Sequence, residues 1–249
     1  MYKSFIHPIL EYGDVLLSNI TEIQSYKLEC VQKRCGRVVS GAIRGTSGKI
    51  IYDELGWESL SNRRDKHRIF LLHKIIHGSA PQYLKDIMPD LVGNRTNYHL
   101  RNIRDIDTDP FKARTVSFFQ SFFPKTIRSW NMLNSDLRQI SDFVAFKKAY
   151  CLSDPKPNKL YLFSKNRKLS VIHARLRMEC SCLGAHLYNH GVIRSPRCPC
   201  GYPSENSIHF FFNCPRFNTQ RAALHDKVVR HGMFTLSTLL YGVKEEQPS

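Results

Sequence analysis

Apolar side chains recur at helical spacing through most of the first ninety residues. Polar capping residues and glycines bracket the periodic segments, which places the helix ends. We expect helices over 2–17, about 21–41, 50–55 and from 59 or 61 to 76. The last of these helices has an inner face formed by Ile69, Leu72, Ile75 and Ile76.

The periodic pattern weakens after this region and returns beyond residue 117. Residues 91–117 are rich in asparagine and aspartate and include a glycine, which favours a loop. Pro155 and Pro157 interrupt any regular element and mark a linker. Further helices are expected over 124–133, 142–150, 169–187 and 217–229.

These elements predict a mainly α fold with a helical region over 1–150 and a small helical module over 169–235. A linker over 151–168 separates the two, and 236–249 is expected to form a tail. Hydrophobic residues make up 42% of the chain, which is enough to build a core and excludes wholesale disorder.

Charge is the first feature that bears on function. The chain has 37 Lys and Arg against 21 Asp and Glu, a net charge of +16. When the chain is divided at residue 150, each half carries +8, so no tail holds the excess. A folded protein with such basic faces favours a polyanionic partner, of which RNA or DNA is the commonest. The alternative is a solvated surface that is merely basic.

No run of about 18 apolar residues is present, so no membrane-spanning helix and no membrane partner are expected. The first residues also lack the apolar stretch and the small-residue cleavage site of a signal peptide. We therefore expect an intracellular protein, in the cytoplasm, the nucleus or both. Its eight cysteines are then expected to stay reduced.

Three cysteines and one histidine gather within seventeen positions near the C-terminus, at Cys198, Cys200, His209 and Cys214. Thiolates and imidazole are the ligands of closed tetrahedral zinc sites, so Zn²⁺ is the predicted cofactor. Pro199 and Gly201 favour a tight turn at the first pair of ligands. His209 and Cys214 are about 140° apart on an ideal helix, so they converge only if the helix ends between them. Pro215 favours that ending.

The alternative for this cluster is a set of free buried thiols and a core histidine. A single residue separates Cys198 from Cys200, where two residues are more usual between paired zinc ligands. Proline and glycine around a paired-thiol corner are not expected from core packing, which favours the metal. Outside the cluster, Cys180 and Cys182 are expected to be one buried and one exposed thiol.

Two groups of cations are candidate phosphate contacts, with a solvated helix face as the alternative. They lie at the start of the helix that ends at residue 76 and within 169–187, at Arg63, Arg64, Lys66, Arg68, Arg175 and Arg177. Trp130 and the run Phe118–Phe123 are expected in the core. At least two residues of Phe210–Phe212 are also expected there, with a base-stacking platform as the alternative.

Several short motifs follow one another along the chain. Towards the C-terminus they are Ala174-Arg-Leu-Arg-Met178, Leu183-Gly-Ala-His-Leu187, Ser195-Pro-Arg-Cys198-Pro-Cys200-Gly201 and Glu205-x-x-x-His209-Phe-Phe-Phe-x-Cys214-Pro215. Towards the N-terminus they are Tyr2-Lys3-Ser-Phe-Ile6-His-Pro8-Ile-Leu10-Glu-Tyr12-Gly, Leu28-Glu29-x-Val31-Gln32-Lys33-Arg34, Leu71-Leu-His-Lys74-Ile-Ile-His-Gly78-x-Ala80-Pro81 and Ser121-Phe-Phe-Pro124-x-Thr126-Ile-Arg128-x-Trp130-Asn131-x-Leu133. Their order and number resemble the C-terminal, post-polymerase and zinc-binding region of non-LTR, LINE- or jockey-type retrotransposon reverse transcriptases.

The resemblance implies that 1–150 is a thumb- or connector-like region and that 169–235 is the zinc-binding tail module. Such enzymes polymerise DNA with a pair of palm aspartates, and this chain contains no Asp-Asp pair. The implied function is that of a non-catalytic C-terminal portion of an RNA-directed DNA polymerase that holds RNA or DNA. The alternative is a structural remnant that packs against a polymerase module and binds nothing alone.

Overall fold

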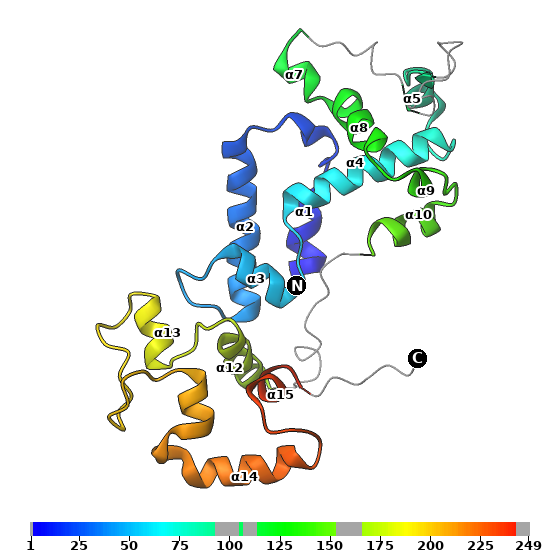
Figure 1. The fold of residues 1–249 in the computed structure, drawn as a ribbon. Coiled ribbons are helices and arrows are strands. Elements are labelled where there is room, and N and C mark those ends of the chain that lie inside the picture. The colour runs from blue at the N-terminus through cyan, green and yellow to red at the C-terminus, as the bar shows by residue number, and fades with distance from the viewer. Residues whose placement is uncertain (1, 93–104, 107–113, 153–165, 243–249) are drawn as a thin grey trace. The chain divides into compact units, whose positions relative to one another are not determined.

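The computed structural model describes residues 2–92, 105–106, 114–152 and 166–242, which are mainly α-helical (Figure 1). Strand pairing among these residues is limited to one isolated antiparallel bridge between Leu91 and Ile106. The predicted fold class is therefore confirmed. No helix in this described part is both long enough and apolar enough to cross a bilayer.

The chain divides into two compact units, each built from two stretches of sequence. The first unit consists of Met1–Gln32 and Glu58–Pro155, and the second of Lys33–Trp57 and Lys156–Ser249. The second unit thus includes Lys33–Trp57, which the sequence pattern grouped with the first region. The division at Pro155 falls in the predicted linker, most of which lies outside the described residues.

The single helix predicted over 2–17 is wrong, because the backbone breaks twice. Three short elements replace it: a π-helix η1 over Tyr2–Ile6, α1 over His7–Glu11 and a 3₁₀ turn η2 over Leu16–Asn19. Pro8 lies in the first turn of α1, where its missing N–H is tolerated. Gly13 then adopts φ +64°, a left-handed conformation that ends the helical path.

The two long helices begin at the polar residues that predicted them. α2 spans Glu22–Ser40, and Thr21 caps its start together with Gln24. The Gln24 N–H donates to Thr21 Oγ1 at 3.3 Å, and the Thr21 N–H donates to Gln24 Oε1 at 3.2 Å. α4 spans Leu60–Ile76, and Ser59 Oγ accepts a backbone N–H of its first turn at 3.2 Å.

Shorter helices complete the first unit, namely α5 over Gln82–Asp86, α7 over Val116–Phe119, α8 over Phe122–Asn131, α9 over Ser135–Arg138 and α10 over Phe143–Tyr150. α8 and α10 confirm the helices predicted over 124–133 and 142–150. Most of the loop predicted over 91–117 lies outside the described residues.

The core of the first unit lies between α4, α8 and α10, and Figure 1 shows α8 alongside α4. Its almost fully buried side chains include Leu72, Ile127, Trp130 and Phe146. The predicted burial of Phe118–Phe123 is only partly right, because Phe118 and Phe119 remain 45% and 43% exposed. α7 ends at Phe119 and α8 starts at Phe122, so the two phenylalanine pairs do not share one helix face.

The single helix predicted over 169–187 is also wrong. Two helices replace it: α12 over Arg167–Arg177 and α13 over Gly184–Asn189. The break is a Schellman motif, in which Glu179 adopts φ 52° and the Cys180 N–H donates back to Arg175 O at 2.8 Å. Among the described residues, Glu179 is the only non-glycine with positive φ, so no glycine in the sequence marks this helix end.

One apolar cluster of the second unit joins α3, Gly48–Leu55, to α12. Its buried members are Ile51, Leu55, Ala174, Met178 and Cys180. Gly41 permits a close approach beside it, because a Cβ there would lie 2.5 Å from Val171 Cγ1. The short helix predicted to stop at Gly56 is confirmed, since Gly56 caps α3 at φ 59°.

A second cluster joins α12 and α13 to the end of the described chain. Leu176 and Leu183 pack with Leu240 of α15, Leu236–Tyr241, and partly buried phenylalanines surround them. The first part of the predicted tail, 236–249, therefore forms a helix that packs into this unit. α14, Asn218–Val229, confirms the helix predicted over 217–229.

The left-handed Glu179 generates a prediction about stability. A side chain strains the backbone at φ 52°, so Glu179→Gly should raise the free energy of unfolding by about 1 kcal/mol in urea denaturation followed by circular dichroism. Glu179→Ala is the matched control, because it removes the same carboxylate but keeps Cβ, and it should give no gain. Equal stabilisation by both variants would assign the effect to charge and contradict the prediction.

Candidate metal centre

The four residues predicted to bind a metal ion come together in the second unit. Three Sγ atoms and one imidazole nitrogen all lie within 4.8 Å of one another, from Cys198, Cys200, His209 and Cys214. Cys200 is half-buried and the other three residues are buried. No other group of three or more potential ligands is found in the part of the chain that the structure describes.

The first two ligands lie on a tight turn. The Gly201 N–H donates to Cys198 O at 2.9 Å, and the Cys198 N–H donates to Tyr202 O at 2.9 Å. Gly201 adopts φ +94°, a conformation that a residue with a Cβ rarely takes, so the turn predicted at this glycine is confirmed. The turn brings both sulfur atoms within reach of a single ion.

The other two candidate ligands lie at the two ends of a single π-helical turn, η4, over His209–Asn213. His209 is its first residue, and Cys214 directly follows its last residue. The Cys214 N–H donates to His209 O at 2.7 Å, and Cys214 is extended at φ −69° and ψ 120°. A π-turn is wider than an α-turn, so it brings residues five positions apart closer to the same side. The helix ends before Pro215 as predicted, although the π geometry was not foreseen.

The distances fit a tetrahedral zinc site. Cys198 Sγ lies 3.8 Å from Cys214 Sγ, and Cys200 Sγ lies 3.3 Å from His209 Nε2. Zinc–ligand bonds of about 2.3 Å to sulfur and 2.0 Å to nitrogen give tetrahedral edges of about 3.8 Å between two sulfurs and 3.5 Å between sulfur and nitrogen. A disulfide needs an S–S distance of about 2.05 Å, and all eight cysteines are free thiols.

The surroundings shift the pKa values of the two thiols on this turn, Cys198 and Cys200, in opposite directions. Burial raises the pKa of Cys198 to about 11, since a thiolate there would be poorly solvated. The backbone N–H of Tyr202 lowers the pKa of Cys200 by bonding to its sulfur. A cation at the centre of the cluster would supply the positive charge that a buried Cys198 thiolate needs.

Glu205 ties the first turn to α13. Its Oε2 accepts the Gly184 N–H at 2.8 Å, and its Oε1 lies 3.5 Å from Cys198 Sγ. The Glu205 N–H donates to Pro196 O at 2.8 Å, which closes the same loop. A Cβ at Gly184 would lie 2.9 Å from Pro196 O, so only glycine fits at the start of α13.

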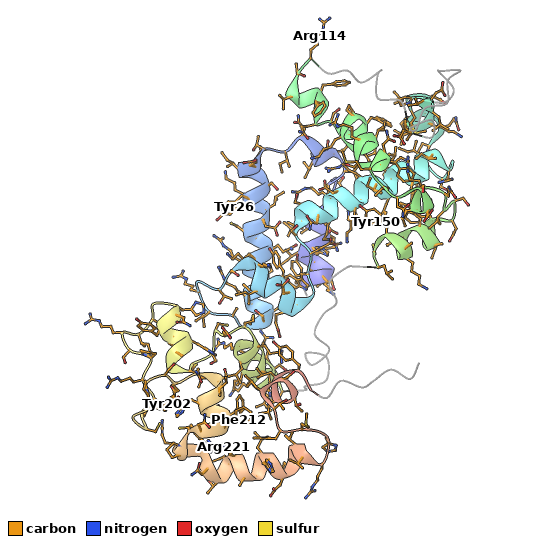
Figure 2. The ribbon with its side chains drawn as sticks, viewed as in Figure 1. Tyr26, Arg114, Tyr150, Tyr202, Phe212 and Arg221 are labelled. Atoms are coloured by element: carbon orange, nitrogen blue, oxygen red, sulfur yellow. The ribbon has the colours of Figure 1, made fainter. Side chains whose placement is uncertain are left out.

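Arg221 ties the second pair of ligands to α14 (Figure 2). Its Nε donates to Phe211 O at 2.8 Å and its Nη2 to Cys214 O at 2.6 Å. These carbonyls lie at the end of η4, where a helix runs out of its own N–H donors. One side chain therefore caps the turn and fixes the residue that carries the last ligand.

An aromatic ring covers the imidazole of the site. The Tyr202 ring stacks on His209 with a centroid distance of 4.3 Å and an interplanar angle of 5°. The His209 N–H donates to Asn206 Oδ1 at 2.8 Å, which fixes the backbone at the start of η4. With Nε2 directed at the sulfurs, the buried Nδ1 has no hydrogen-bond partner among the described residues.

The four cations at the start of α4 contact groups of the first unit. Arg63 pairs with Glu11, Lys66 with Glu58 at 2.7 Å, Arg68 with Asp65, and Arg64 donates to Ser25 Oγ at 2.7 Å. Arg64 and Arg68 are each only 4% exposed. Phosphate contact by these four cations stays a prediction, and for Arg64 and Arg68 it requires their side chains to move.

The two cations predicted on α12 contact groups of the second unit. Arg175 Nε donates to Gly41 O at 2.6 Å. Arg177 Nε donates to Glu54 Oε1 at 2.8 Å, and the Arg177 side chain is only 1% exposed. Arg177 is thus one half of a buried ion pair, and the phosphate contact predicted for it would need that pair to open.

Two other predictions from the sequence are confirmed here. Phe210 and Phe211 pack against the core of the second unit, and Cys180 is buried while Cys182 is exposed. Sequence reasoning missed the roles of Tyr202 and Glu205. Glu205 lies in a recognised motif, but its bond to Gly184 depends on how the loop folds back. The role of Tyr202 depends on its ring contact with His209, seven positions further along, which the sequence does not signal.

No protein-family model, no curated protein and no solved structure matches this chain. The fold and the site define a mainly α protein with a candidate Cys₃His metal centre.

The cluster predicts bound metal in a defined ratio. Protein purified with zinc present should retain about one Zn²⁺ per chain by mass spectrometry of its metals, because four protein ligands close the site. Cys214→Ser should reduce that value to under about a tenth and unfold the second unit, since the metal holds its loops together. Cys182→Ser, which alters an exposed thiol outside the cluster, should keep the full amount. A wild-type chain that holds no metal would contradict the prediction.

Proposed function

We propose that the second unit is a zinc-stabilised nucleic-acid-binding region and that the chain is the C-terminal part of a LINE- or jockey-type reverse transcriptase. The charge of the two units carries the first part of this proposal. The second unit has 19 Lys and Arg against 7 Asp and Glu, a net charge of +12. The first unit has 18 against 14, a net charge of +4. A basic excess gathered in one folded unit favours a polyanionic ligand there.

The segment that contains the candidate metal centre is also basic. Residues 180–225 include four arginines and a single acidic residue, Glu205. Glu205 is engaged with the Gly184 N–H, so it does not present a free carboxylate to a ligand. Arg194, Arg197 and Arg216 are exposed beside the cluster, and we assign phosphate contact to them.

The ligand set supports zinc in a structural role. Three thiolates and one imidazole suit zinc better than magnesium or calcium, which prefer oxygen ligands. Four protein ligands leave no open position for a substrate, which is typical of structural and not of catalytic zinc. We therefore propose a non-catalytic protein in which zinc fixes the loops that carry the arginines.

The resemblance supplies the biological setting of the proposal. The motifs from Ala174 to Pro215 and from Tyr2 to Leu133 follow the order of the region after the polymerase module. RNA or DNA handled during reverse transcription is the ligand this implies, in the cytoplasm, the nucleus or both. A polymerase module of the parent protein is then the natural protein partner.

A salt titration tests the proposed function. The affinity of the zinc-loaded chain for RNA or DNA should fall steeply with salt, with a log–log slope of about −0.9 per phosphate contact on duplex DNA. The variant Arg194→Gln with Arg197→Gln should weaken binding and make the slope shallower by about 1 to 2. Fluorescence anisotropy of a labelled oligonucleotide measures both quantities.

A matched control removes the same charge from the first unit. Lys85→Gln with Lys148→Gln changes two exposed lysines and should leave both affinity and slope nearly unchanged. If the wild-type chain at micromolar concentration binds neither RNA nor DNA at low salt, the proposed function is wrong. If both double variants weaken binding equally, the charge gathered in the second unit is not the cause.

The exposed apolar surface of the first helices favours a second candidate function, packing against a polymerase module. Large apolar side chains stand 68% to 88% exposed there, at Phe5, Ile9, Tyr12, Leu16, Ile23 and Tyr26. Large apolar side chains left exposed in this number within one short stretch of the chain are typical of a segment that another protein covers. This role is compatible with nucleic-acid binding by the second unit.

Self-association of the isolated chain tests the second candidate. Ile9→Ser with Tyr12→Ser should lower self-association in sedimentation velocity and leave the melting temperature within about 2 °C, because both side chains are mostly exposed. Met132→Ser with Val144→Ser alters residues of this unit that are 85% and 72% exposed outside the first helices, and it should have no effect. A chain that is monomeric before any substitution would count against this surface.

A further inference from the structure

We infer that Tyr202 is a stacking platform that makes the second unit prefer single-stranded over duplex nucleic acid. The inference rests on the proposed function and names the ligand class of the same surface. Tyr202 is 49% exposed although one face of its ring lies flat on His209. The exposed part of a rigid aromatic ring is a surface on which an unpaired base can stack.

The metal centre holds the Tyr202 ring in place. The Tyr202 carbonyl accepts the Cys198 N–H at 2.9 Å, which fixes the Tyr202 backbone on the turn that carries the first two candidate ligands. The ring itself lies on His209, which is 2% exposed and directed at the sulfurs. A ring held in this way loses little conformational entropy when a base stacks on it.

Exposed cationic and apolar residues are close in sequence to the residues that hold this ring. The Cys198 N–H donates to Tyr202 O, and the exposed Arg197 directly precedes Cys198 in the chain. Ile208, one residue before the candidate ligand His209, is an apolar side chain that is 55% exposed. Cations that hold the backbone next to an aromatic surface are the combination that single strands require.

The structure also explains why the neighbouring phenylalanines do not fill this role. Phe210 and Phe211 pack against Leu176, Leu183 and Leu240 in the core of the unit. Phe212 contacts the ring of Phe234 at a centroid distance of 5.3 Å. Figure 2 shows Tyr202 and Phe212 at separate places in this part of the chain.

The test compares single strands with a duplex. The zinc-loaded full chain is titrated against labelled oligo(U), oligo(dT) and a duplex, each of about 12 nucleotides. Tyr202→Ala should weaken binding to the single strands about 10-fold, leave duplex binding within about twofold, and keep the salt slope. Tyr202→Phe should restore single-strand binding, because stacking needs the ring and not the hydroxyl. The oligo(U) and oligo(dT) arms separate RNA from DNA.

Tyr188 supplies the matched control. It has the same 49% exposure and lies on α13 of the same unit, away from the metal ligands in sequence. Tyr188→Ala should leave single-strand affinity within about twofold of wild type. The inference is overturned if Tyr202→Ala binds single strands as wild type does, or if it weakens single-strand and duplex binding equally.

If Tyr202→Ala loses its zinc, its weaker binding does not test stacking, and a second variant is needed. Tyr202→Trp keeps an aromatic ring over His209, and stacking of a base should quench its fluorescence beyond that of the native Trp57 and Trp130. Absence of added quenching at saturating oligonucleotide overturns the inference. The two proposals fail in different ways: no binding by wild type overturns the proposed function, whereas binding that ignores Tyr202 overturns only this inference.

Discussion

The convergence of three thiols and one imidazole is the constraint on which the second unit depends. Its two apolar clusters are small, and the loop over 190–206 has no helix of its own. A metal ion held by these four residues would link the turn at Cys198 to the π-turn at His209. Glu205 and Arg221 join these two turns to α13 and α14. A unit with so limited a core would gain much of its stability from such a link.

The sequence predicted the features that depend on local chemistry. The caps at Thr21 and Ser59, the turn at Gly201 and the four-residue ligand set each depend on residues close together in the chain. The sequence pattern predicted the wrong helix where α12 ends without a glycine. Glu179 takes the left-handed position that glycine normally marks, so a pattern of apolar spacing runs through the break unchanged.

The roles of the cations could not be predicted from their spacing. Arg177 meets Glu54, which is distant in the sequence, and only the packing of α3 on α12 brings them together. The same packing assigns Lys33–Trp57 to the second unit and concentrates the positive charge there. The net charge is the same for the two halves of the chain divided at residue 150, but it differs between the two folded units.

The discontinuity of the second unit has a consequence for how it is assembled. Ile51 and Ala174 belong to one cluster although they are 123 positions apart, and the entire later stretch of the first unit is synthesised between them. Closing so long a loop is slow and entropically costly, so α3 must wait with its apolar face uncovered until α12 leaves the ribosome. During that interval Ile51 and Leu55 are available to chaperones, and a chain that stops in the linker never covers them.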